Sequence, residues 1–298
     1  RGDLYHSGDN DLTSTVSYRG DPGWQARGIA AAAVDMRWPF MGEFLGGIQR
    51  ITPRIQMVAA PHLANLRLPN EDARAVDLED SNLFALNRFS GYDRFEDSSR
   101  ITYGLDYSFT RPGWSVEANI GQSYRLDRRP AILPDGTGLS DRMSDIVGRT
   151  TVRFKDFVAF THRFRLDKDN LSVRRNEIDA TVGSRSTYAR VSYLRLNRNA
   201  LTAQEDLADR EELRLGGRVQ FARFWSVFGS TVVDLTDAKE DPTSIADGYE
   251  PVRHRLGVAY EDDCLTLGVT WRRDYIANGD ARRGNSFQLR LAFRNLGI

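Results

Sequence analysis

Apolar residues occupy every second position in a series of short segments between Ile101 and Phe293. In the last segment, Phe287, Leu289, Leu291 and Phe293 alternate with residues that are mostly polar. A period of two places these two sets on opposite faces of an extended strand. Many such strands separated by turn residues predict a β-barrel or a large β-sandwich.

About fourteen alternating segments can be assigned, most of them about 9–13 residues long. Strands of soluble proteins average about 5–6 residues, whereas tilted strands that cross a membrane need about 9–11. Segment length therefore favours a transmembrane barrel. The predicted strands span residues 12–19, 25–37, 49–59, 99–109, 113–126, 147–155, 157–167, 172–183, 188–197, 211–222, 224–236, 251–262, 264–276 and 285–296.

The placement of aromatic residues helps to separate the two architectures, which alternation alone does not. In a sandwich the apolar face forms the core, whereas in a membrane barrel it meets lipid and the polar face lines the lumen. Aromatic side chains near segment ends on apolar faces are typical of the interfacial girdles of barrels, although core aromatics would show the same pattern. These residues are Phe109, Trp114, Tyr124, Trp225, Tyr260, Trp271 and Phe293.

Short and long links between the segments alternate, as the periplasmic turns and outer loops of outer-membrane barrels do. Links 20–24 and 168–171 are shorter than this rule expects, and link 38–48 is longer. The stretch 60–98 is too long for a plain loop, so we expect a short strand near 82–87 or an inward fold. The other long links are 127–146, 198–210, 237–250 and 277–284.

Composition narrows the partners of the chain. Its 298 residues include 41 basic and 41 acidic side chains, which gives no support for a nucleic-acid partner. No stretch approaches the roughly 18 apolar residues of a membrane helix, but membrane-spanning strands need none. The chain begins at Arg1 without a signal peptide, so we expect part of a longer protein or a processed product.

Residue patterns that carry enzyme chemistry are scarce. Neither zinc-ligand spacing nor a G-x-S-x-G, H-E-x-x-H or phosphate-binding glycine motif occurs. We therefore expect no catalysis, no cofactor and no metal. A hidden outer-membrane enzyme would have to use His162 with Ser or Asp neighbours. The other histidines are His6, His62 and His254.

Arginines recur on the polar faces of the later segments. The guanidinium group presents a planar fork of donors that suits phosphate and carboxylate groups. In a lumen these residues would contact an anionic lipid head group or a plug protein, or they would pair with carboxylates such as Glu117, Glu177 and Asp179. The set is Arg190, Arg214, Arg218, Arg255, Arg272 and Arg290.

Cys264 is the single cysteine and follows the short turn of residues 261–263. If the last segment ends at the periplasmic rim, counting back places this turn there too, in an oxidising compartment. Position alone leaves two interpretations open. One is a disulfide to a part of the protein outside this chain, and the other is a free, buried thiol.

Residues 87–94, N-R-F-S-G-Y-D-R, together with D-S-S-R-I-T-Y-G at 97–104, resemble the LPS-assembly outer-membrane protein family, LptD (also called OstA or Imp). The sequences I-T-P-R at 51–54 and G-Q-S-Y at 121–124 fit the same family, and the resemblance covers roughly residues 25–296. The first motif is fairly specific. Its candidate functional residues are Asn87, Arg88, Gly91, Asp93 and Arg94.

The resemblance implies a large barrel in the outer membrane of a Gram-negative bacterium, preceded by a periplasmic jelly-roll domain. An LptE lipoprotein would plug the lumen, and lipopolysaccharide would arrive through a periplasmic bridge protein. Its lipid would leave through a seam between the first and last strands. Residues 1–298 would then be the C-terminal part of the barrel domain, without the periplasmic domain and the first strands, and 285–296 would be one lip of the seam.

The resemblance also bears on Cys264, which matches a position that forms a disulfide to the N-terminal part in relatives. The family often has two adjacent cysteines here, but the first position is Asp263 in this chain. At most one such disulfide from this region is therefore implied.

We thus expect an all-β chain, a fragment of about 14 strands from a larger transmembrane antiparallel barrel. Its function would be lipopolysaccharide transport, with insertion into the outer leaflet and no covalent chemistry. Three alternatives remain. They are a self-contained outer-membrane channel or porin-like transporter, an outer-membrane enzyme, and a soluble β-sandwich or propeller used for binding.

Overall fold

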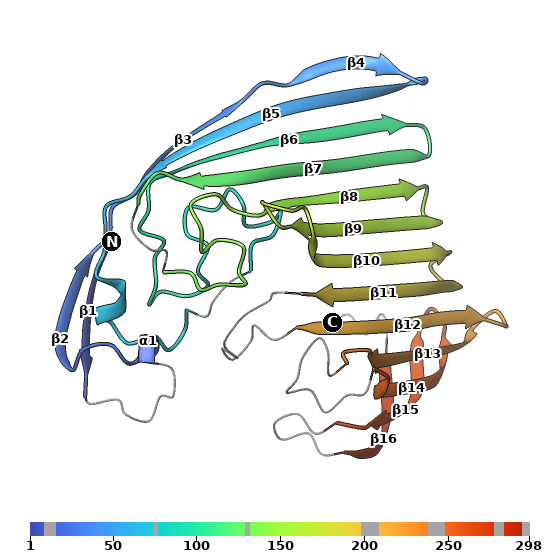
Figure 1. Ribbon diagram of the computed structural model, residues 1–298. Coiled ribbons are helices and arrows are strands. Elements are labelled where there is room, and N and C mark those ends of the chain that lie inside the picture. The colour runs from blue at the N-terminus through green and yellow to red at the C-terminus, as the bar shows by residue number, and fades with distance from the viewer. Residues whose placement is uncertain are drawn as a thin grey trace.

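The computed structural model describes residues 1–8, 16–73, 77–128, 132–197, 209–237, 248–276 and 283–293. One antiparallel sheet dominates this part of the chain, and a small separate hairpin lies near its N-terminal end (Figure 1). Within these ranges, neither helical segment has the length and apolar character needed to cross a bilayer.

The elements follow the chain in this order: β1 (Gly2–Ser7), α1 (Val16–Arg19), β2 (Gly23–Gly28), β3 (Ala32–Arg37), β4 (Phe40–Phe44), β5 (Gly47–Ala59), η1 (Asn65–Arg67), β6 (Arg100–Arg111), β7 (Trp114–Arg125), β8 (Ile146–Phe154), β9 (Val158–Leu166), β10 (Val173–Gly183), β11 (Tyr188–Leu196), β12 (Arg210–Gln220), β13 (Trp225–Asp234), β14 (Glu250–Glu261), β15 (Leu265–Asp274) and β16 (Gly284–Phe293).

The main sheet is a meander in which each strand from β5 to β16 pairs with its neighbours in sequence. Strands β3 and β4 both pair with β5 and together form one edge, while β16 forms the other. Among the described residues the sheet has fourteen strands and is not closed. Pro39 separates β3 from β4, because proline has no N–H to continue the ladder.

The two faces of the sheet have opposite chemistry. The face that we call outer carries the apolar rows, and these are exposed: Leu105 by 40%, Val258 by 41% and Leu289 by 69%. The face that we call inner carries the polar rows, including buried Thr102 and Ser123. Apolar rows that face outward confirm the barrel-type prediction, whereas a soluble sandwich, which would bury them, is wrong.

The alternation identified the later strands correctly. Each predicted segment from 49–59 to 285–296 corresponds to one strand from β5 to β16, with ends that shift by a few residues. All the predicted girdle aromatics lie on outer-face rows, as with Trp114 opposite Phe154 and Trp225 opposite Tyr260. The period of two was therefore sufficient to predict the twelve strands of this region.

The N-terminal predictions were wrong in three places. Segment 12–19 is not a strand where it is described, because Val16–Arg19 is helical, and residues 9–15 lie outside the described residues. Segment 25–37 belongs to two strands, since β2 pairs with β1 while β3 pairs with β5. Link 38–48 contains strand β4, whose five residues give a weak alternation interrupted by Gly42.

Candidate functional site on the inner face

Two loops fold together against the inner face of the sheet beside β6–β9 (Figure 1). They comprise residues 60–73 with 77–98, and residues 132–145, and we call them together the inner loop body. Their apolar side chains form a small core with one residue of β8. The core residues are Ala73, Leu78, Leu83, Phe89, Leu133, Leu139 and Val147.

Two glycines let the inner loop body approach the sheet closely. Gly104 in β6 and Gly121 in β7 are directly paired. A Cβ atom at Gly121 would lie 2.5 Å from Leu83 Cδ2, and one at Gly104 would lie 3.3 Å from Phe84 Cζ. The inward fold expected for residues 60–98 is therefore confirmed. No strand forms near 82–87, because residues 80–84 make a turn that presents Leu83 and Phe84 to these glycines.

Buried arginines anchor the inner loop body to β6 and β7. Arg88 donates to Glu96 Oε1 at 3.2 Å, to the Leu83 carbonyl at 3.1 Å and to Ser123 Oγ of β7 at 2.9 Å. Arg100, the first residue of β6, donates to the carbonyls of Ala85 and Leu86 at 2.7 and 2.9 Å. Burying a guanidinium costs free energy that hydrogen bonds and a nearby carboxylate offset, so these contacts fix the loop to the sheet.

A second anchor comes from β9. The Arg165 side chain is 1% exposed and lies 3.3 Å from Asp77 Oδ1 and 3.4 Å from Asp145 Oδ2. It also donates to the carbonyls of Thr137 and Gly136, at 2.9 and 2.8 Å. Burial raises the pKa of the Asp145 carboxyl, which lies in the loop before β8. Arg165 thus joins both loops of the body to the sheet.

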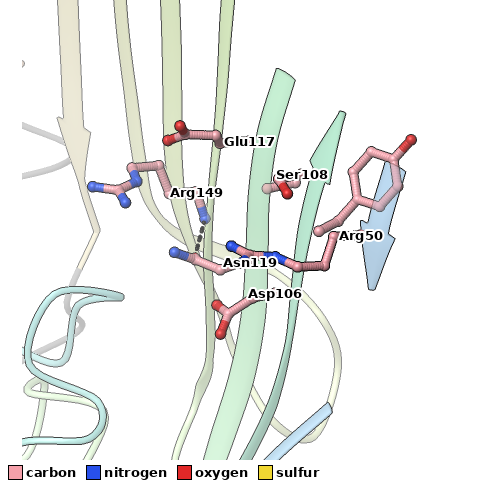
Figure 2. Close-up of a pocket in the computed structure, with 8 residues that line it drawn as sticks. Arg50, Asp106, Ser108, Glu117, Asn119 and Arg149 are labelled. Atoms are coloured by element: carbon pink, nitrogen blue, oxygen red, sulfur yellow. Dashed lines mark hydrogen bonds between the residues drawn. The ribbon is translucent and has the colours of Figure 1, made fainter. Parts of the chain in front are cut away.

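A polar cavity of about 300 Å³ lies on the inner face across β5–β8 (Figure 2). Figure 2 shows side chains of both charges gathered there from four neighbouring strands, with Asn119 Oδ1 accepting from the Arg149 backbone N–H at 3.0 Å. Such a surface suits a polar group that presents both charges. The labelled lining residues are Arg50, Asp106, Ser108, Glu117, Asn119 and Arg149.

A larger groove of about 820 Å³ crosses the inner face from β11 to β16. Its reach from Arg190 on β11 to Arg290 on β16 shows that this face is concave. Arg218 and Arg255 line it as well, and Glu261 is its one lining carboxylate among the described residues. The groove is therefore basic and attracts anionic groups.

The structure places all six arginines predicted from the sequence on the inner face, but their surroundings differ. Arg218 pairs with Glu261 at 3.1 Å and Arg272 with Asp274 at 2.6 Å, while Arg190 donates to Thr181 Oγ1 at 3.2 Å. Arg214 pairs with Glu212. Arg255 and Arg290 have no ion pair with any residue in the described part of the chain.

The carboxylates proposed from the sequence as their partners are used elsewhere or stay apart. Glu177 and Asp179 lie 2.8 and 3.5 Å from Arg163 of the neighbouring strand. Glu117 lines the smaller cavity. Pairing with inner-face carboxylates was thus the correct general expectation for part of the set, with different carboxylates.

Comparison with known proteins identifies the family. The sequence profile of LptD, described as LPS transport system D, matches residues 1–225. The chain belongs to the LptD family. It is 26% identical over 254 residues to the LPS-assembly protein LptD of Nitrosococcus oceani, and 25% identical over 238 residues to that of Burkholderia thailandensis. A shorter match to the LptD of Acinetobacter baylyi reaches 36% over 85 residues.

The alignments cover much of this chain and a small part of its relatives. They include 84% of the chain but 31% of the Nitrosococcus oceani protein, and 78% of the chain but 28% of the Burkholderia thailandensis protein. The Acinetobacter baylyi match covers 28% of the chain and 10% of that protein. The chain therefore spans about a third of the length of the curated LptD proteins it matches over most of its length.

The LptD motif at 87–94 builds the inner loop body. Asn87 accepts from the backbone N–H groups of Phe89 and Glu96, and so closes the turn between them. Asp93 accepts from the backbone of Glu71 and Asp72. Arg94 is buried and donates to the Leu68 carbonyl at 2.9 Å. These hydrogen bonds show that the motif residues stabilise the conformation of the loop.

Gly91 has the strictest backbone requirement of the motif. Its φ is +86°, and a Cβ atom there would lie 2.6 Å from the Asp72 carbonyl oxygen. Asp72 in turn accepts from the backbone N–H groups of Tyr92 and Asp93. Only glycine fits this left-handed, crowded position without strain.

Sequence reasoning missed Arg27 of β2, which joins the N-terminal hairpin to the same loop. Its buried guanidinium contacts Asp3 Oδ2 at 2.7 Å and Asn65 Oδ1 at 3.1 Å. It also donates to the carbonyls of Tyr92 and Asp93, at 2.7 and 2.8 Å. Neither period nor motif marked this residue, and only the fold brings its partners together.

Cys264 is exposed, so the alternative of a buried thiol is wrong. Asp262 Oδ1 holds the turn by accepting from the backbone N–H groups of Cys264 and Leu265, at 2.8 and 2.7 Å. The thiol is therefore presented at a hydrogen-bonded, accessible turn between β14 and β15. A disulfide with a residue outside this chain remains a prediction.

Among the described residues, the His162 ring has no Ser or Asp side chain as a hydrogen-bond partner. It lies on the outer face, opposite Thr150, and its Nε2 is 2.9 Å from Asn176 Oδ1. Within the described ranges no group of three or more His, Cys, Asp and Glu side chains is arranged to hold a metal ion.

Proposed function

We propose that this chain forms the C-terminal part of an outer-membrane β-barrel that assembles lipopolysaccharide into the outer leaflet of a Gram-negative cell. The observation that carries the proposal is the LptD profile match over residues 1–225. Relatives that bear the name LPS-assembly protein align over most of the chain. Residues outside this chain would supply the periplasmic domain and the first strands of the barrel.

The exposed apolar residues of the outer face support the proposed location in the membrane. Apolar side chains that are 40% or more exposed, such as Leu105 and Val258, cost free energy in water and are stable against hydrocarbon. The inner face keeps its polar rows around an aqueous interior. The backbone groups of the strands are paired along the meander, as a lipid environment requires.

Strand β16 provides the lip through which lipid leaves. It is a sheet edge whose outer-face residues Phe287, Leu289 and Leu291 are exposed. A seam there, with fewer ladder hydrogen bonds than an ordinary strand pair, opens at lower cost. The open edge does not favour a self-contained channel, which needs closure.

The two parts of the inner face would have different partners. The inner loop body covers the part beside β6–β9, whereas the basic groove across β11–β16 remains accessible to an LptE-like lipoprotein plug. A periplasmic bridge protein would deliver lipopolysaccharide through the N-terminal domain. No nucleic acid, cofactor or chemical step has a place in this mechanism.

The function is tested in cells that depend on the full-length protein. Cysteines at Gln288 of β16 and at the facing position of the first barrel strand would lock the seam under oxidising conditions. We expect the lock to stop delivery of new lipopolysaccharide to the surface, measured by surface labelling, and a reductant to restore it. Undiminished delivery through a fully cross-linked seam would contradict the proposal.

The proposal includes a disulfide between Cys264 and the N-terminal part of the full-length protein. Its support is the exposed thiol at a hydrogen-bonded turn. Replacement of Cys264 by Ser is expected to slow maturation and to abolish a mobility shift between reducing and non-reducing gels. Unchanged mobility and unchanged maturation would show that the thiol stays free.

A further inference from the structure

A polar row crosses the outer face of the last four strands. Residues Thr231 of β13, His254 of β14, Arg273 of β15 and Asn285 of β16 are paired in register, each directly opposite the next. The row one step away on the same face is apolar and consists of Leu256, Trp271 and Phe287. The outer face therefore changes from apolar to polar within one register step.

The polar row lies at the end of the strands from which the long links start. These links, 235–249 and 275–283, follow β13 and β15 directly, whereas the opposite strand ends are joined by short turns such as 262–264. Long links belong to the outer surface of an outer-membrane barrel. The row thus marks the level of the outer-leaflet head groups, where basic and amphipathic side chains reach polar groups of lipids.

An aromatic ring brings the two basic residues of the row together. The Arg273 guanidinium carbon lies 4.7 Å from the centroid of the Tyr275 ring, and the His254 ring meets the same ring edge-on at 5.1 Å. Thr231 Oγ1 is 2.8 Å from His254 Nδ1 and orients the imidazole. Arg273 and His254 are held in place by these contacts.

The same contacts leave hydrogen-bond donors available. The contact with Tyr275 is made to the aromatic ring and not to a hydrogen-bond acceptor. The N–H donors of the Arg273 guanidinium form no hydrogen bond with another residue in the part of the chain that the structure describes. Arg273 and His254 have no ion pair with a carboxylate in the part of the chain that the structure describes. Asn285 Oδ1 accepts from Trp271 Nε1 at 3.2 Å, which directs the amide NH₂ of Asn285 to serve as a further donor.

We propose that Arg273, His254 and Asn285 form an outer-face site for the phosphate group of a phosphorylated glycolipid. A phosphate presents several acceptor oxygens and a negative charge, which match a guanidinium fork, an imidazole and an amide. The apolar rows immediately below the site suit the acyl chains of the same molecule. Among the described residues, no carboxylate is paired with the two basic residues to compete with the phosphate.

The occupant is a glycolipid of the outer leaflet because the site lies on the three strands that end at the β16 edge. This choice rests on the proposed function, in which lipopolysaccharide leaves the interior at that edge. The site would receive the phosphate of the emerging lipid and keep its acyl chains against β14–β16. It deepens the proposed function by assigning the first contact after exit.

The test uses the full-length protein with its plug partner, carrying Arg273→Gln together with His254→Gln. The matched control is Arg223→Gln, which removes an exposed arginine from the turn between β12 and β13, at the opposite end of the strands. Binding of lipopolysaccharide and of enzymatically dephosphorylated lipopolysaccharide is measured in bilayer nanodiscs of phosphatidylethanolamine. We expect the double variant to bind lipopolysaccharide about tenfold more weakly, since it loses the guanidinium donors of Arg273 and the imidazole of His254.

The wild type is expected to prefer the phosphorylated lipid, and the double variant is expected to lose that preference while Arg223→Gln retains it. A double variant with wild-type preference would overturn the site. Equal loss of binding to phosphatidylglycerol would also overturn it, because the row would then be a general anchor for anionic lipid. Heat-modifiable migration on gels verifies that each variant is folded.

Failure of the site and failure of the proposed function are distinguishable. If the double variant binds like the wild type but locking the β16 seam still stops delivery, the site is wrong and the function stands. If locking the seam leaves delivery intact, the proposed function is wrong whatever the binding assay gives.

Discussion

The two halves of the inner face use the same residue type in opposite ways. Beside β6–β9, Arg88, Arg100 and Arg165 are buried and each contacts several groups of the inner loop body. Across β11–β16, Arg255 and Arg290 line an open groove and pair with no carboxylate in the described part of the chain. The burial of an arginine, and not its place on a polar row, decides whether it supports structure or receives a partner.

The largest expected effect comes from Arg165→Met. The change leaves Asp77 and Asp145 buried without their main cation, and breaking such a buried pair costs about 3–5 kcal/mol. We expect the inner loop body to open, with rapid hydrogen exchange of amides in 77–97 of the full-length protein. Arg165→Lys retains the charge, and its amide exchange rates are expected to lie between those of the wild type and those of Arg165→Met. Equal protection in wild type and Arg165→Met would contradict the comparison.

Gly91→Ala is expected to cost about 1–3 kcal/mol, because alanine at φ +86° is strained and its Cβ meets Asp72. Thermal unfolding and protease digestion of the 60–98 loop measure the loss. The control is Gly268→Ala in β15, where a Cβ atom would lie 3.9 Å from its nearest neighbour, the Val258 carbonyl oxygen. If both substitutions were equally neutral, the motif glycine would not be a conformational requirement.

Asp167, in the turn after β9, gives a smaller and pH-dependent effect. The Arg174 guanidinium, 2.7 Å away, lowers the pKa of the Asp167 carboxyl from 3.8 to about 2. A lowered pKa stabilises the folded turn above about pH 4, and this contribution of about 1 kcal/mol disappears as the pH falls toward 2.

Pepsin digestion between pH 4 and pH 2 measures that contribution at residues 167–172. The wild type is expected to become more sensitive as the pH falls, while Asp167→Asn is already sensitive at pH 4 and changes little. Identical pH profiles for the two proteins would show that the ion pair does not stabilise the turn.

The smallest expected effect is that of Arg255→Gln. This groove residue has no ion pair in the described ranges, so its replacement is expected to change the free energy of unfolding by less than about 0.5 kcal/mol. The measurement is the same thermal scan used for Gly91→Ala. A large loss of stability would show that the groove arginines are structural after all.

The fold was largely predictable because the period of two is a direct consequence of strand geometry, and β5 to β16 follow it closely. The N-terminal part was not, since β2 and β3 share one alternating run and differ only in their pairing partners. Pairing is a tertiary property that a local pattern does not contain. The helix at Val16–Arg19 was missed because four residues are too few to show a helical period.

The site was predictable in its residue types and not in its contacts. The polar rows placed Arg190 through Arg290 on the inner face, and the LptD motif marked the loop around Gly91. The sequence did not show that Arg165 and Arg27 would become buried anchors, because their partners come from distant segments. Nor did the sequence single out Arg273 and His254, because their proposed role depends on their being paired across neighbouring strands.

The contact between Arg165 and Asp77 joins positions 88 residues apart. Asp77 precedes β6, whereas Arg165 lies in β9. The loop therefore reaches its final form only when the four strands β6 to β9 have paired. Completion of that loop therefore depends on a wall that includes β9. A half-built wall would expose an unfinished segment with uncompensated acidic groups, which quality-control proteases could recognise and remove.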